Sequence, residues 1–334
     1  MRHFLNIAIV LLVQLLICSS VFAEDFSAKT QLQADTANGA FFSKSIPVVK
    51  VSGFNREAIF SRHEAVDLKA FDLKDATVFN DTRITSIGNS DFSLAIYANG
   101  EMVSFDNNRL HRESILNWNK VQGISLSEAQ KIAENYLETN IKPFLSLSSH
   151  ERIVPFHVMY QHYGEGEAEK IIAYNIVFSR MIDDIHVIGA GSKIRITVGV
   201  DGAVIGYRYD WSKIDSIDYY KSVSGDELNN RKKQVCKNAH VKCEALKTVD
   251  RFECGIYDPG ALHRYNNVVN SLQPACFISA RASQNDAQSY ATFIPLLERE
   301  LIVVDQNWVE TGMIVNDSDI TNILPSIDGK IQNN

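Results

Sequence analysis

The segment Tyr174–Trp211 constrains the fold of this chain most, because its residues alternate as those of paired β-strands do. Over Lys193–Val200 each polar residue or glycine is followed by an apolar one, which is typical of a strand with one buried face. Asp201-Gly202 then supplies residues that tolerate a positive φ, so a tight hairpin into Ala203–Trp211 is predicted. The segment therefore predicts antiparallel sheet and carries no catalytic motif.

Three helices are predicted from capping residues that precede apolar stripes. Asn55 is placed to cap a short helix over Arg56–Val66. The spacing of a capping box, a serine followed three residues later by a glutamate, occurs at Ser125–Glu128 and again at Ser224–Glu227. The first box begins the clearest apolar stripe of the chain, and the second begins a helix expected over Gly225–His240.

Strand signals follow each predicted helix. Asn99-Gly100 lies between alternating runs, and Val154–Tyr163 and Lys170–Arg180 are expected to pair. The sequence thus predicts an α+β fold of two or three similar modules, each a helix packed on an antiparallel β-sheet. The expected organisation is a signal peptide over 1–23, a flexible leader over 24–45, an N-terminal α+β module over 46–120, a second α+β module over 121–215 and a disulfide-bearing C-terminal module over 216–334.

The first residues indicate export. A short positive start precedes the apolar run Phe4–Ile17, and Val21-Phe22-Ala23 suits cleavage by a signal peptidase. The mature chain is therefore expected to be periplasmic or secreted. A retained membrane anchor is one alternative, although the run is shorter than the roughly 20 residues that span a bilayer. Lipidation at Cys18 is another, disfavoured by the bulky residue before it.

Loss of the signal peptide leaves four cysteines, all in the last third of the chain. These are Cys236, Cys243, Cys254 and Cys276. In an oxidising compartment they predict two disulfides, and the sequence does not choose among the three possible pairings. No C-x-x-C spacing is present, so a zinc site is not predicted. A thiol nucleophile served by His240 or His263 is an alternative that no local feature supports.

The charge balance argues against nucleic acid as a partner. The chain carries 33 basic and 40 acidic residues, for a net charge of −7. No basic stripe is present, so nucleic acid is not an expected partner. No second apolar stretch is long enough to cross a membrane, and no cofactor motif occurs. A protein or peptide partner is therefore expected.

The second predicted module resembles a known family. The helix ISLSEAQKIAENYLE from Ile124, followed by YNIVFSR, IHVIGAGSKIRITV and VDGAVIGY, is similar to the PepSY-like domains of exported bacterial proteins. The likeness covers about residues 123–211, and Met181–His186 departs from the turn frequent in that family. The resemblance implies a small helix-on-sheet module without catalytic residues, in an accessory, inhibitory or chaperone-like role.

Candidate catalytic and ligand-binding groups are few. No H-E-x-x-H occurs, and His157 and His162 are spaced to lie on opposite faces of a strand, so a shared metal is not predicted. Asp183-Asp184 fits a solvated turn better than a carboxylate pair. Gly189–Ser192 matches neither a phosphate loop nor a nucleophile turn, and it predicts a flexible connection between strands.

An aromatic row carries the strongest binding hypothesis. Tyr207, Tyr209 and Trp211 share one face of a predicted strand, which is typical of a core or a domain interface. If exposed, the row would bind a peptide, glycan or protein. With Asp183, Asp184 and His186 of the loop Ile182–Ser192, these residues are the candidate binding set.

The sequence therefore favours an exported, non-catalytic protein that binds or modulates a partner. One alternative is an exported hydrolase whose active-site residues come from distant segments, with Asp183, Asp184, His186 and His263 as candidates. A secreted effector or toxin component is the other.

Overall fold

The structure of the protein is a computed structural model that describes residues 45–117, 123–163, 170–228, 230–231, 248–267, 270–281, 288–297 and 313–316. Within this part of the chain, strands form one connected sheet of 15 members. The strands are β1 (Ser45–Ser52), β2 (Thr77–Asn80), β3 (Ile84–Gly88), β4 (Ser93–Tyr97), β5 (Met102–Asp106), β6 (Glu151–Tyr163), β7 (Lys170–Ile182), β8 (Ile185–Ile188), β9 (Lys193–Gly199), β10 (Val204–Asp210), β11 (Lys213–Lys221), β12 (Thr248–Tyr257), β13 (Ser271–Arg281), β14 (Gln288–Pro295) and β15 (Met313–Asn316). The helices are α3 (Arg56–Asp67), α4 (Asn108–Asn117), α5 (Leu126–Tyr136) and α7 (Ala261–Asn267), with short turns η1 (Ala98–Gly100), η2 (Leu137–Ile141) and η3 (Lys142–Phe144).

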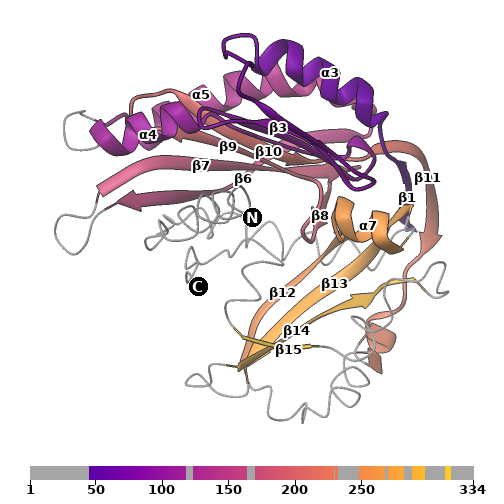
Figure 1. The fold of residues 1–334 in the computed structure, drawn as a ribbon. Coiled ribbons are helices and arrows are strands. Elements are labelled where there is room, and N and C mark those ends of the chain that lie inside the picture. Colours follow the sequence, from indigo (N-terminus) through magenta and orange to yellow (C-terminus); the bar gives the residue numbers. More distant parts are fainter. Residues whose placement is uncertain are drawn as a thin grey trace.

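The main layer is an antiparallel sheet covered on one face by helices. Its strands run in the order β6-β7-β9-β10-β5-β4-β3-β2. Helices α3, α4 and α5 lie together on one side of it (Figure 1). Helix α3 packs on β4, whereas α5 packs on β7, β9 and β10.

This main layer consists of two halves with the same order of elements. In the first half α3 precedes β2, β3, β4 and β5, and in the second α5 precedes β6, β7, β9 and β10. The last strands of the two halves, β5 and β10, pair in antiparallel fashion at the centre, from Gly206 opposite Asp106 to Asp210 opposite Met102. The two halves are therefore related by an approximate two-fold axis between β5 and β10.

A second layer carries the C-terminal strands. Strand β13 pairs with β12, β14 and the end of β1, and β1 pairs along its length with β11. The short strand β8 joins the layers, because it forms a hairpin with β7 and a parallel pair with β12. Strand β1, expected at the start of the N-terminal module, thus belongs to the second layer (Figure 1).

The expected fold of two or three modules, each a helix on its own small sheet, is wrong. The described residues are mostly strands, and these strands form a single large mixed sheet. The physical reason is that each separate small sheet would leave edge strands with unpaired N–H and C=O groups. Pairing β5 with β10, and β8 with β12, satisfies those groups and joins the sheets.

The predictions of helices capped at Asn55 and Ser125 and of a turn at Asn99-Gly100 are confirmed. Of the helix expected over Gly225–His240, residues 225–228 and 230–231 are helical, and the others lie outside the described residues. Asn55 accepts a hydrogen bond from the Ala58 N–H at 2.7 Å, and the Ser125 capping box is complete. The Ser224 hydroxyl accepts from the Glu227 N–H at 3.2 Å, at the start of a helix described over 225–228. Asn99 and Gly100 have φ of 51° and 73°, as a tight hairpin requires.

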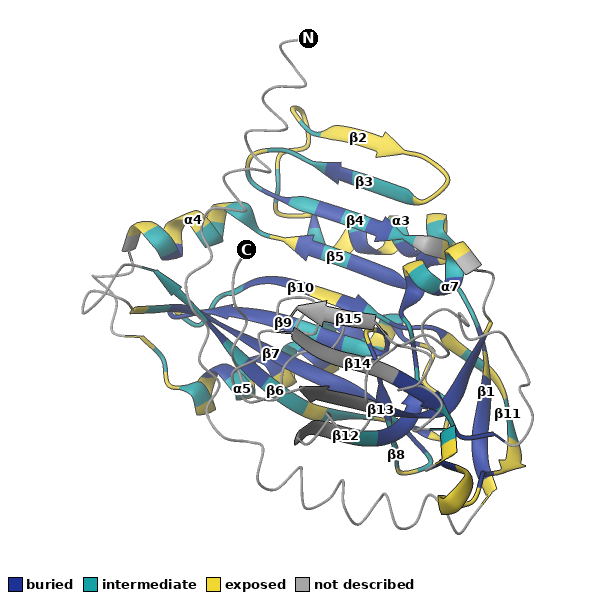
Figure 2. Cartoon of the chain, turned by 90° about the horizontal axis from the view of Figure 1, so that it is seen from below, coloured by how far each residue is buried: buried dark blue, intermediate teal, exposed yellow. Residues whose placement is uncertain are grey.

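Burial is greatest at the centre of the main layer, where β7 is buried on both faces over residues 172–180. The helix-facing residues of β7, β9 and β10 are almost fully buried and form the largest core, whereas β2 at the far edge is exposed throughout (Figure 2). None of the described helices combines the length and apolar character needed to cross a membrane. The proposed signal peptide and leader up to residue 44 lie outside the described residues.

One of the predicted disulfides is present. Cys254 on β12 lies directly opposite Cys276 on β13, and their sulfur atoms are bonded. Both side chains are buried in a core beneath β1 that includes Ile46 and Val48. Cys236 and Cys243 lie outside the described residues.

The disulfide gives a prediction that peptide mapping tests. A tryptic digest made without reduction is expected to contain peptide 252–264 linked to peptide 265–281, because these carry Cys254 and Cys276. Replacing both cysteines by alanine is expected to lower the free energy of unfolding by about 3 kcal/mol, the chain-entropy value for such a loop. Linkage of peptide 252–264 to a peptide containing Cys236 or Cys243 would contradict the pairing.

Candidate functional site

The aromatic row lies in the core. Tyr207, Tyr209 and Trp211 are 3%, 1% and 0% exposed, so they do not form an exposed binding surface, and that hypothesis is wrong. The physical reason is that β10 is a central strand whose helix-facing side is covered by both α3 and α5. The tyrosine hydroxyl groups are therefore satisfied within the protein rather than by a ligand.

A buried polar network holds these tyrosines to α3. The Tyr207 hydroxyl donates to Asp67 Oδ2 at 2.6 Å, and the Tyr209 hydroxyl lies 2.9 Å from His63 Nε2. His63 Nδ1 is 2.9 Å from the same Asp67 oxygen. On its other side the His63 ring stacks on Phe144 at 4.2 Å between centroids. The network is closed and fully buried, so it positions α3 and offers no opening to a substrate.

The Asp183-Asp184 pair forms the turn between β7 and β8. The two residues have φ of 47° and 66°, which is typical of a type I′ hairpin. Asp183 binds His150 Nδ1 at 2.8 Å and accepts from the Tyr219 hydroxyl, whereas Asp184 pairs with Arg152. The two carboxylates therefore hold the turn to neighbouring elements through separate partners, and they do not form a shared catalytic or cation-binding pair.

His186 lies apart from these carboxylates, on β8. It is opposite Met181, and burial lowers its pKa. His263 lies on α7, in the second layer. No cluster of three or more metal-ligating side chains occurs in the part of the chain that the structure describes. The residues considered for a hydrolase are thus not gathered at one place.

The loop Gly189–Ser192 is part of a buried ionic cluster that sequence reasoning missed. The Ser192 hydroxyl donates to Asp258 Oδ2 at 2.6 Å, and Asp258 also pairs with Arg264 of α7. A side chain at Gly191 would collide with this carboxyl group, since its Cβ would lie 2.3 Å from Asp258 Oδ1. Glycine is therefore required here by close approach, not by a phosphate ligand.

Arg264 extends the cluster into the main layer. It binds Glu101 at 2.8 Å and Asp210 at 3.4 Å, next to the β5–β10 pair. Burial raises the pKa of Glu101, and the Arg264 guanidinium opposes that rise. The cluster has no described opening, so it acts as a junction between the layers. No sequence pattern marks it, because its members are far apart in the chain.

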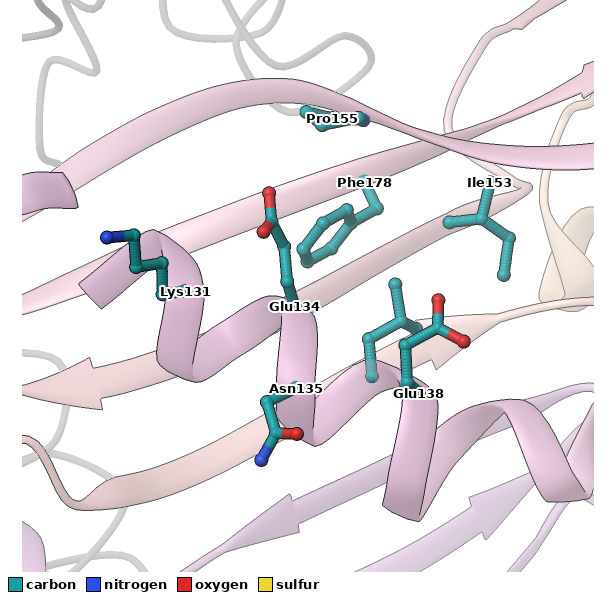
Figure 3. A pocket seen from close by; sticks show the side chains of 8 residues that line it. Lys131, Glu134, Asn135, Glu138, Ile153, Pro155 and Phe178 are labelled. Carbon is teal, nitrogen blue, oxygen red and sulfur yellow. The ribbon is translucent and has the colours of Figure 1, made fainter. Parts of the chain in front are cut away.

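An open groove lies on the helix-covered face, between α5 and the edge strand β6. Its volume is about 490 Å³, within the roughly 300–1,000 Å³ range of ligand sites. Helix α5 packs on β7, β9 and β10, and the start of β6 at Ile153 and Pro155 stays partly open, whereas Val158 and Tyr160 further along β6 are buried. The lining residues are Lys131, Glu134, Asn135, Leu137, Glu138, Ile153, Pro155 and Phe178 (Figure 3).

The groove has an apolar floor and a charged rim. Phe178 and Leu137 are buried beneath it, with half-buried Ile153 beside them. Glu134 points from α5 toward Phe178 and Pro155 (Figure 3). Glu138 is paired with Lys142, whereas no ion pair of Glu134 is present among the described residues. The groove can therefore hold an apolar side chain and present a carboxylate to a cationic group beside it.

Comparisons with known proteins identify no family that this chain resembles. The chain matches no protein-family model, and a search of curated proteins found no match.

The buried tyrosines predict alkaline destabilisation. Burial raises the pKa of Tyr136, Tyr207 and Tyr209, with Asp67 the next contributor in each case. Their raised folded-state pKa gives stability that is present below the unfolded tyrosine pKa of about 10 and is lost as pH rises above it. Tyr207→Phe is expected to reduce the loss by about 1.4 kcal/mol per pH unit above that value. The free energy of urea unfolding at stepped alkaline pH measures this.

The matched control is Tyr220→Phe, at a tyrosine that is 37% exposed. It is expected to leave the pH slope as in the wild type. Equal slopes in the wild type and Tyr207→Phe would show that the Tyr207 hydroxyl ionises as freely in the folded chain as in the unfolded one.

Proposed function

We propose that the protein is an exported, non-catalytic binding protein that modulates a partner outside the cytoplasm by holding an extended segment of it in the α5–β6 groove. The groove carries the proposal, because it combines an apolar floor, half-buried at Ile153 and exposed at Pro155, with the carboxylate of Glu134, which has no ion pair among the described residues. An apolar side chain of the partner would lie on Phe178 and Ile153. A lysine or arginine next to it would pair with Glu134.

The place of the groove in the chain supports a modulatory role. All of its walls belong to residues 121–215, the part that resembles PepSY-like domains. The order of a capped helix, a long strand pair and a tight hairpin fits that resemblance, and the inhibitory or chaperone-like role proposed here follows from it. The signal-like residues 1–23 support export, periplasmic or secreted.

Site-specific crosslinking tests the proposal. A photoreactive amino acid at Asn135, on the groove side of α5, is expected to crosslink a segment of the partner in the native extract. Ser127 lies on the same helix, is also exposed and does not line the groove. The same amino acid there is expected to give no product. Equal products at both positions, or none at Asn135, would contradict binding in the groove.

A charge reversal in the groove gives a second measure. Glu134→Lys removes the carboxylate and places a like charge against a basic partner residue, so capture is expected to fall at least about tenfold, or about 1.4 kcal/mol. Glu113→Lys is the matched control, since Glu113 is exposed on α4 and outside the groove. Both variants are expected to keep the wild-type thermal midpoint. If Glu134→Lys and Glu113→Lys lost capture equally, the loss would be due to the change in net charge and not to the groove.

A further inference from the structure

The face of the main layer opposite α3, α4 and α5 carries an arginine pair. Arg195 on β9 and Arg208 on β10 are directly opposite each other in the strand register, so their side chains project from the same face. Phe178 and Tyr207 point to the helix-covered face, and the neighbouring positions Val177 and Arg208 point to the other. The arginine pair therefore lies on the opposite side of the sheet from the groove.

Neither arginine forms an ion pair within the part of the chain that the structure describes. Arg208 is exposed, and its Nη2 atom contacts only the Met102 sulfur, at 3.1 Å. Arg195 is half-buried, and its Nε atom is buried without a hydrogen-bond partner. Burial and then the charge of Arg208 lower the pKa of Arg195. The two guanidinium groups thus project from neighbouring positions of the sheet, and the Met102 sulfur is their one acceptor among the described residues.

One carboxylate lies near the pair. Asp106 is opposite Gly206 on β10, two residues before Arg208, and a Cβ at Gly206 would lie 3.0 Å from Asp106 Oδ1. Among the described residues Asp106 forms no ion pair with either arginine, although burial raises its pKa and the charges of Arg195 and Arg208 oppose that rise. His111 is also close to Asp106, but burial lowers its pKa and favours its neutral form at neutral pH. Two arginines beside one aspartate leave a local charge of +1 on a chain of net charge −7.

Such an arrangement is unfavourable unless an anion joins it. Like charges directly opposite each other on neighbouring strands destabilise a sheet. Guanidinium groups bind carboxylates through two parallel hydrogen bonds, and two of them side by side offer several such donors. A single negative charge would neutralise the site.

We propose that Arg195 and Arg208 form a binding site for a carboxylate of an acidic peptide segment. The surplus charge of +1 fits a carboxylate, whereas a phosphate dianion would leave the site negative. A peptide is the fitting source, because Arg208 of β10 and Asp106 of β5 are exposed and can be reached by a large partner. Ser104, opposite Arg208, adds a hydroxyl beside the site. The site does not depend on the groove.

Fluorescence anisotropy with a labelled hexaglutamate peptide tests the proposal. The wild-type protein is expected to bind the peptide, and Arg195→Met and Arg208→Met are each expected to weaken binding at least about tenfold. Arg208→Lys keeps the charge but loses the planar fork, so an intermediate loss is expected. Arg152→Met is the matched control, because Arg152 is an exposed arginine that pairs with Asp184 elsewhere. A loss equal to that of Arg195→Met in this control, or no binding by the wild type, would overturn the proposal.

Competition identifies the anion. Acetate is expected to displace the peptide at concentrations no higher than those of inorganic phosphate. Displacement by phosphate at tenfold lower concentration would assign the site to a phosphate group and overturn the carboxylate assignment. A hexalysine peptide is expected not to bind.

Thermal stability separates a binding role from a structural one. Without ligand, Arg195→Met is expected to raise the thermal midpoint or leave it unchanged, because it removes repulsion from Arg208. Added hexaglutamate is expected to raise the midpoint of the wild type and not that of Arg195→Met. A lower midpoint in unliganded Arg195→Met would show that the arginine serves the fold, contrary to the proposal. Failure of the Glu134→Lys experiment would leave these results unaffected, since the two sites lie on opposite faces.

Discussion

The pairing of β5 with β10 determines where every other feature of the molecule lies. It joins the two helix-and-four-strand halves into one sheet and places α3 and α5 on the same face. Tyr207 and Tyr209 of β10 then meet His63 of α3, and the Tyr207 ring lies 5.9 Å from that of Tyr136 on α5. The approach of the strands at Gly206 requires glycine, since its Cβ would lie 2.8 Å from the Phe105 carbonyl oxygen. The pairing of β5 with β10 thus determines the positions of both α3 and α5.

The buried ionic cluster joins the two layers, as the pairing of β5 with β10 joins the two halves of the main layer. Arg264 of α7 reaches Glu101, which directly precedes β5, and Asp210, which ends β10. The backbone of the same region contributes as well, because the Trp211 N–H donates to the Glu101 carbonyl oxygen at 2.7 Å. A buried charge that loses its partner is costly, by about 3–5 kcal/mol. The position of the second layer therefore depends on a set of mutually satisfied charges rather than on apolar packing alone.

Sequence patterns predicted the parts of this structure that local chemistry decides. Ser125 with Glu128, Asn99-Gly100 and the alternation over Lys193–Val200 each specify an element through neighbours in the chain. The pairing of β8 with β12 and the contact of Ser192 with Asp258 join residues about 70 positions apart, and no local pattern records them. For the same reason the aromatic row was assigned correctly to one face of a strand, while its burial depended on which helices cover that face. In the sequence, the groove residues of α5 can be recognised only as the polar side of a helix.

Uneven coverage of the main layer explains why its two proposed binding surfaces differ in chemistry. On one face the strands pack against helices and therefore present apolar side chains. The part of β6 that α5 leaves open is apolar for this reason, and the charged residues of the groove come from α5 and η2. On the other face α7 contacts the end of β10, where Arg264 pairs with Asp210, and polar residues such as Thr197 and Arg195 occupy the alternate positions of β9. A partner segment that fits the groove must be apolar and basic, whereas one that fits the arginine pair must be acidic. The groove uses β6 and β7, whereas the arginine pair uses β9 and β10. Because the two surfaces also lie on opposite faces of the sheet, they share no residue.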